Sequence, residues 1–312
     1  MKMNFRKTAA ALTVSIAAMT GSMTLAEVES NDPIKIALNE WTGQHLSANI
    51  AAELLKKMGY TVELVTAGGL PQFTALEQGE LHFNPEVWDN SITDAYTNGL
   101  EAGAIVDMGT LGLEPREGWI YPQYMTEKCP GLPSYQALYD CAQAFANPET
   151  FPNGRLITYP ADWGTRSKSV VEGIALPFNP IPGGSEGAMV AELKSALASE
   201  EPILMMFWQP HWVFAELDMG WIEWNAVDGE CVEENQQRDT ACGFAQASVN
   251  KIASKSLAET WPGAADLVGK FTLTNDEQNA MILAVDQEGR ALEEVVQEWL
   301  TTNESKWSAW VN

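Results

Sequence analysis

Apolar and polar residues alternate in short blocks along the first hundred residues after position 30. Residues Ile34 to Leu38 alternate as a strand does, and apolar residues then recur at helical spacing from Thr42 to Met58, where Gly59 ends the helix. A second strand pattern over residues 60–65 completes a β-α-β unit, whose strands are expected to pair in parallel. Further along, the pattern predicts a helix over 70–78, a strand over 81–88 and a helix over 92–99. It therefore predicts one α/β unit.

The sequence pattern changes after residue 118, where a short extended segment leads into a proline-rich stretch with cysteines. We expect the chain to enter a second α/β lobe here, and a helical tail that follows this lobe to complete the first one. The predicted division is residues 27–120 plus 243–312 for lobe 1 and 121–242 for lobe 2, with two chain crossings and a ligand cleft between the lobes. Beyond residue 118 the pattern predicts strands over 155–159, 203–208, 221–227 and 245–253, and helices over 134–145, 167–175, 185–198, 256–261, 264–271, 276–286 and 292–310.

Tryptophans gather where predicted strands end. Trp88 and Trp163 each follow an apolar run and a proline, and Trp208 ends an apolar run two residues before a proline. Trp41 ends an alternating strand, and Trp212 lies four residues after Trp208. Open α/β sheets hold ligands at the carboxyl ends of their strands. Several indoles at such an edge predict an aromatic cage, which suits a small methylated cation. The alternative is that the rings only plug the strand ends.

Two neighbouring segments add polar groups to this edge. Gly164 and Thr165 lie between a predicted strand and a helix, where backbone N–H groups at the helix N-terminus form a site for an anion. Glu117 and Trp119 lie at the predicted hinge. A carboxylate there would balance an ammonium or, when protonated, donate to a ligand oxygen; the alternative is an exposed hinge acid.

Composition and the N-terminus indicate an exported protein. Lys2, Arg6 and Lys7 precede a short apolar stretch, and small residues end at Ala26, so residues 1–26 have the build of a signal peptide removed near Ala26. The net charge of -24 argues against nucleic acid as a partner and favours a soluble monomer.

The four cysteines, in an exported chain, favour disulfides. Three pairings are possible, and we expect the local ones, Cys129–Cys141 and Cys231–Cys242, each of which closes a short loop. The second loop is acidic. Its carboxylate and carbonyl oxygens offer a site for Ca²⁺, and the alternative is a solvated acidic loop. The candidate ligands are Asp228, Glu230, Glu233, Glu234 and Asp239. We expect no other cofactor.

A second class of function is an exported serine hydrolase. Gly183 to Gly187 matches the G-x-S-x-G nucleophile elbow around Ser185. However, prolines occupy the strand that the elbow needs, and His211 follows Ser185 without a convincing triad order. Ser185 is therefore better explained as a helix cap, and no catalytic residue is predicted.

At this point the sequence resembles a known family, the periplasmic substrate-binding proteins of glycine betaine, choline and trimethylamine N-oxide ABC transporters. The likeness covers nearly the whole mature chain and is carried by residues 54–62, 83–88, 163–165 and, most specifically, 207–213. It implies a type II-like fold of two α/β lobes that close on a ligand, with Trp88, Trp163 and Trp208 in the cage and the backbone of Gly164 and Thr165 at a ligand carboxylate. It also implies an inner-membrane permease as partner and a periplasmic location.

The sequence departs from the glycine betaine pattern in one respect. That pattern has a histidine shortly after the first cage tryptophan, whereas Asp89 to Ile92 follow Trp88 here. Glu117 would also repel a ligand carboxylate. We therefore rank trimethylamine N-oxide first, with choline, glycine betaine and dimethylsulfoniopropionate as alternatives.

Overall fold

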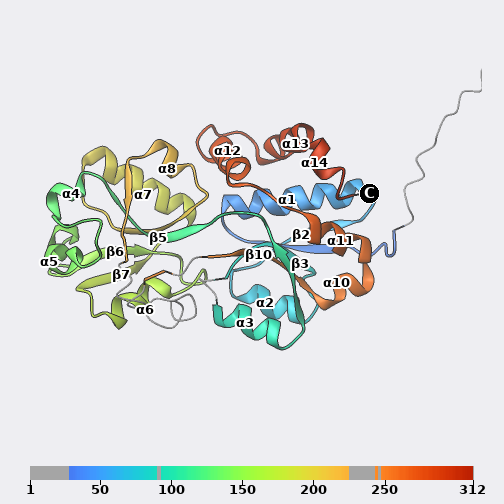
Figure 1. The fold of residues 1–312 in the computed structure, drawn as a ribbon, viewed down its shortest axis with the longest axis horizontal. Coiled ribbons are helices and arrows are strands. Elements are labelled where there is room, and N and C mark those ends of the chain that lie inside the picture. The colour runs from blue at the N-terminus through green and yellow to red at the C-terminus, as the bar shows by residue number, and fades with distance from the viewer. Residues whose placement is uncertain (1–27, 90–92, 225–242, 245–246, 312) are drawn as a thin grey trace, which may run out of the picture.

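Two five-stranded sheets, each with helices packed against it, form two lobes that lie side by side (Figure 1). The computed structural model describes residues 28–89, 93–224, 243–244 and 247–311. The predicted two-lobed α/β fold is confirmed. Among the helices of these residues, none is both long enough and apolar enough to cross a bilayer.

Lobe 1 is built on the sheet β2-β1-β3-β10-β4. Strand β1 pairs in parallel with β2 and β3, whereas β10 is antiparallel to β3 and β4. Helices α1 and α12 lie over one face and α2 and α3 over the other (Figure 1). Its elements are β1 (Ile34–Leu38), α1 (Thr42–Lys57), β2 (Val62–Thr66), α2 (Pro71–Glu77), β3 (Phe83–Trp88), α3 (Thr93–Glu101), β4 (Ile105–Thr110), β10 (Val249–Ser254), α10 (Lys255–Thr260), α11 (Pro262–Lys270), α12 (Asn275–Asp286), α13 (Leu292–Thr302) and α14 (Glu304–Trp307).

Lobe 2 is built on the sheet β7-β6-β8-β5-β9. Strand β6 is parallel to β7 and β8, and β5 is antiparallel to β8 and β9. Its elements are β5 (Arg116–Pro122), α4 (Met125–Lys128), α5 (Ala137–Cys141), the 3₁₀ helix η1 (Ala142–Phe145), β6 (Gly154–Thr158), α6 (Arg166–Gly173), β7 (Phe178–Pro182), α7 (Glu186–Ser199), β8 (Met205–Gln209), α8 (Val213–Glu216) and β9 (Met219–Trp221).

The first chain crossing lies earlier than the sequence suggested. Strand β5 was expected to fall mostly in lobe 1, but it pairs with β8, so the chain enters lobe 2 between Thr110 and Arg116. It returns between β9 and β10. Strand pairing, which the local pattern does not report, decides this boundary.

Local sequence explains the elements that frame the cleft. Helix α1 buries Leu46, Ile50 and Leu54 at a four-residue spacing, which places one apolar stripe against the sheet. Ser185 directly precedes helix α7, and its Oγ accepts the Ala188 N–H at 3.2 Å. Ser185 is thus a helix cap, as expected. Helix α12 begins with a capping box, in which Thr274 and Glu277 each accept a backbone N–H of the other.

The structure joins Cys129 to Cys141, the local pairing expected, with their Cα atoms 5.3 Å apart. The other expected pair, Cys231–Cys242, lies outside the described residues. So do the signal peptide through Ala26 and the candidate calcium ligands Asp228, Glu230, Glu233, Glu234 and Asp239.

Candidate ligand-binding site

A cavity of about 40 Å³ lies between the lobes. Five of the residues predicted from the sequence line it: Trp41, Trp88, Glu117, Trp163 and Trp208. The remaining lining residues are Gly69, Gln72, Val87 and Tyr159. Lobe 1 supplies Trp41 and Trp88, and lobe 2 supplies the other two tryptophans, so the cavity is complete only when the lobes meet.

Strand ends position the four indoles, as the sequence pattern predicted. Trp88 is the last residue of β3, Trp208 is the penultimate residue of β8, and Trp41 directly precedes α1. Trp163 follows β6 in the segment that leads to α6. Glu117 reaches the same edge because β5 runs antiparallel to β8 and places Glu117 directly opposite Trp208.

The rings meet edge to face. The centroids of Trp41 and Trp163, which belong to different lobes, are 5.2 Å apart at an interplanar angle of 65°. Trp163 and Trp208 are 5.9 Å apart at 76°, and Tyr159 contacts both of these rings. Edge-to-face contact is a favourable geometry for aromatic rings, and electron-rich indoles that line one cavity attract a cation.

Glu117 gives the cavity a negative character. Its side chain is buried, with 8% of the residue exposed, and its Oε1 accepts a hydrogen bond of 2.8 Å from the hydroxyl of Tyr159. Burial, together with the charge of Glu117, raises the pKa of Tyr159 well above its usual range, so Tyr159 stays protonated and donates. Of the described residues that line the cavity, none is Lys, Arg or His.

Some lining residues were missed by sequence reasoning. Tyr159 had a usable signal, because it directly follows strand β6 and precedes a proline, four residues before Trp163. Gln72 had none. It is buried at the start of α2, where it accepts hydrogen bonds from Asn39 and Asn84, and only the packing of three segments brings it to the cavity.

Other predicted residues lie away from the cavity. Trp119 is fully buried two residues further along β5, donates to Ser167 Oγ at 2.9 Å and packs against Trp224. Trp212 donates to Asp286 at 3.3 Å and lies beneath the ammonium of Lys194. Both contacts are structural, and the structure brings neither ring to the cage.

Gly164 and Thr165 line a separate pocket of about 230 Å³ at the start of α6. Tyr159 lines both pockets. The predicted anion site is therefore next to the cage and shares Tyr159 with its lining.

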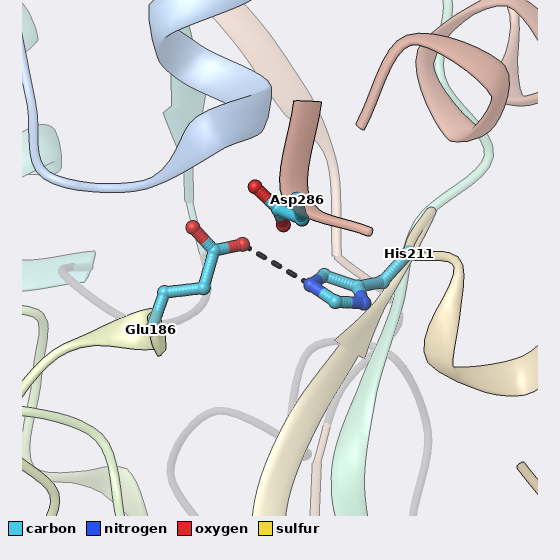
Figure 2. A group of neighbouring side chains, drawn as sticks. All are labelled: Glu186, His211 and Asp286. Carbon is cyan, nitrogen blue, oxygen red and sulfur yellow. Dashed lines mark hydrogen bonds and ion pairs between the residues drawn. The ribbon is translucent and has the colours of Figure 1, made fainter. Parts of the chain in front are cut away.

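A polar cluster apart from the cavity brings together side chains of both lobes: Glu186, His211 and Asp286 (Figure 2). His211 and Glu186 belong to lobe 2 and are joined by a contact of 3.1 Å, whereas Asp286 ends α12 in lobe 1. Thr42 at the start of α1 binds both carboxylates, donating its backbone N–H to Glu186 at 2.7 Å and its hydroxyl to Asp286 at 2.8 Å. A carboxylate of lobe 2 thus caps a helix of lobe 1, which favours lobe closure.

The polar cluster fits a hydrogen-bond network better than a metal site. His211 Nδ1 accepts the backbone N–H of Val213 at 3.2 Å, so the neutral ring carries its hydrogen on Nε2, the atom that faces Glu186. A metal would need that nitrogen without its hydrogen. The same contact removes His211 as a base for Ser185, since its Nε2 is bound to Glu186.

The geometry defines a class of protein: two α/β lobes that close on an aromatic cavity make a two-lobed solute-binding protein. The family is also clear. The chain belongs to the OpuAC family, the substrate-binding domain of ABC-type glycine betaine transport systems, whose model matches residues 32–302.

Similar proteins agree with this assignment. The chain is 26% identical over 305 residues to the trimethylamine N-oxide-binding protein of Pelagibacter ubique (strain HTCC1062), with 96% of each chain covered. Its fold is similar to that of lactococcal OpuAC solved with glycine betaine, at a TM-score of 0.74, 19% identity and coverage of 90% of this chain and 100% of the other. It is also similar to a choline-binding protein solved with choline, at a TM-score of 0.76, 15% identity and coverage of 91% and 93%. By its family, the chain is a substrate-binding protein of ABC-type transport.

Proposed function

We propose that this protein captures a small methylated-ammonium solute, with trimethylamine N-oxide as its principal ligand, and delivers it without chemical change to an ABC transporter permease. The observation that carries the proposal is the cavity itself, in which four indoles from two lobes surround a space beside one carboxylate. Trp41, Trp88, Trp163 and Trp208 would contact the methyl groups, whose positive potential the ring faces attract. Tyr159 would complete the wall.

The charge of the cavity lining favours the N-oxide over solutes that carry a carboxylate. Glycine betaine and dimethylsulfoniopropionate each carry a full carboxylate, which Glu117 would repel and which no lining cation would balance. The same negative charge would instead balance the cationic nitrogen of a ligand that carries no carboxylate. Choline, which carries a hydroxyl and no carboxylate, is the next candidate. The similarity to the Pelagibacter ubique trimethylamine N-oxide-binding protein supports the choice of the N-oxide as the principal ligand.

Lobe closure would couple capture to delivery. The ligand would draw Trp41 and Trp88 against Trp163 and Trp208, and the closed pair of lobes would then present a defined surface to a permease in the inner membrane. The N-terminal features that predict a signal peptide are consistent with a periplasmic protein of this kind.

Isothermal titration calorimetry of residues 27–312 with trimethylamine N-oxide, choline, glycine betaine and dimethylsulfoniopropionate tests the proposal. We expect one-site binding that is tightest for the N-oxide. Tighter binding of glycine betaine would overturn the role given to Glu117 and leave the cage in place, whereas binding of none of the four would overturn the proposed function.

A further inference from the structure

Behind the cage lies a buried carboxylate that the sequence did not single out. Glu86 belongs to β3, two residues before Trp88, and only 1% of it is exposed. It is not among the residues that line the cavity. A carboxylate this deep needs hydrogen-bond donors, because an unpartnered buried charge is costly.

Four side chains donate to Glu86. Its Oε1 accepts the indole N–H of Trp41 at 2.7 Å and that of Trp88 at 3.3 Å. Its Oε2 accepts the hydroxyl of Ser47 and the amide of Gln278, each at 2.7 Å. One carboxylate therefore connects both cage rings of lobe 1 to helices α1 and α12.

These bonds matter most for Trp41. This ring stands in the short connection between β1 and α1, at the N-cap position of α1, where its own side chain makes no capping bond. It is only partly buried, so packing restricts it less than it restricts the other three indoles. A short hydrogen bond to a fixed carboxylate sets the direction of the indole N–H and hence the plane of the ring.

We infer that Glu86 is a positioning residue for the ligand site, which holds the rings of Trp41 and Trp88 in their cage orientation and increases the preference of the cage for a cation. The inference rests on the proposed function. An anion at the N–H edge of an indole pushes electron density toward the ring face, and its charge adds to the negative potential inside the cage. Glu86 does not line the cavity, so it acts through the orientation of the two rings and through its field.

A third cage ring has a related contact that depends on closure. The indole N–H of Trp163, in lobe 2, donates to Glu40 of lobe 1 at 3.0 Å. Glu40 is exposed, so water competes for this bond. Glu86 is thus the carboxylate that organises the cage before the lobes close, and Glu40 adds a weaker bond afterwards.

Glu86→Gln and Glu86→Leu separate orientation from charge. The glutamine keeps an oxygen for the two indoles and removes the charge, so we expect the Kd for trimethylamine N-oxide to rise about fivefold. Leucine also removes the acceptor, and we expect a rise of at least about thirtyfold and a changed near-UV circular dichroism spectrum of the ligand-free protein. Tert-butanol has a similar shape to trimethylamine N-oxide but no formal charges. The preference for the N-oxide over tert-butanol should fall in both Glu86 variants. Glu53→Gln, a surface change on α1, is the control and should leave the Kd unchanged.

Trp41→Phe keeps the test decisive if the Glu86 variants do not fold. It leaves Glu86 in place and removes one donor, and we expect weaker binding with an altered preference between the two solutes. If wild-type protein binds the N-oxide but these variants keep its affinity and its preference over tert-butanol, the inference is wrong and the proposed function stands. If wild-type protein binds no methylated cation, the proposed function itself has failed.

Discussion

Replacement of Gly69 by alanine should hold the lobes apart. Gly69 lies in lobe 1 between β2 and α2 and lines the cavity. A Cβ at this position would lie 2.7 Å from the backbone oxygen of Asp162, which belongs to lobe 2 and directly precedes Trp163. Ordinary van der Waals contact begins at about 3.4 Å. Because the opposing atom is backbone, it cannot rotate away, and the lobes themselves must move.

The size of the effect follows from this overlap. Extra methyl groups in a well-packed contact cost about 1–3 kcal/mol. The whole cost falls on the closed state, because Asp162 is in the other lobe and the backbone of Gly69 is not in the left-handed region that disfavours alanine. The Kd of Gly69→Ala should therefore rise about 5-fold to 150-fold, while the melting temperature of the ligand-free protein stays near that of the wild type.

Calorimetric titration and thermal unfolding measure these two quantities. Gly187→Ala, where a new Cβ meets nothing within 4 Å, is the matched control and should bind as the wild type does. Gly68→Ala should show a smaller loss, since its Cβ would lie 3.2 Å from a carboxylate oxygen of Asp162 that is free to turn. An unchanged Kd for Gly69→Ala would refute the claim that closure brings these two backbones together.

Two further predictions concern pH and the disulfide. Partial desolvation and the nearby charge of Glu186 raise the pKa of Asp286 in the closed state, so closure takes up protons. The affinity for the ligand should therefore fall as the pH rises from the usual aspartate pKa of about 3.9 through the raised value. Asp286→Asn should flatten this dependence in titrations at several pH values, and an unchanged profile would contradict the prediction. The disulfide Cys129–Cys141 joins cysteines 12 residues apart and limits the conformational freedom of the unfolded chain. Its reduction should lower the free energy of unfolding by about 3 kcal/mol in denaturant titrations without changing the Kd. A reduced protein as stable as the oxidised one would contradict this prediction.

Much of the fold could be predicted because its central strands and amphipathic helices have strong local patterns. Strands β4 and β7 were missed for a physical reason. Both are edge strands, and β7 contains two prolines, which an edge tolerates because it does not need every backbone donor. The antiparallel pairing of β5 with β8 was also missed, since pairing depends on contacts between distant segments.

The candidate site was likewise only partly predictable from the sequence. Trp88 and Trp208 could be expected at the cleft because a strand end carries them there. Trp119 and Trp212 share the residue type but lie in structural contacts, and composition alone could not separate the two groups. Glu86 gave no signal, because its role depends on donors that come from three other parts of the chain.

Titration of trimethylamine N-oxide into the wild type and Trp208→Ala tests the central claim, that the indole cage binds the ligand. Loss of one desolvated ring face costs about 2 kcal/mol, so the Kd should rise about thirtyfold. Trp310→Ala, which alters a ring packed on Phe271 in the C-terminal segment, is the control and should keep the wild-type Kd. A Trp208→Ala protein that is folded by circular dichroism and binds with wild-type affinity would contradict the account.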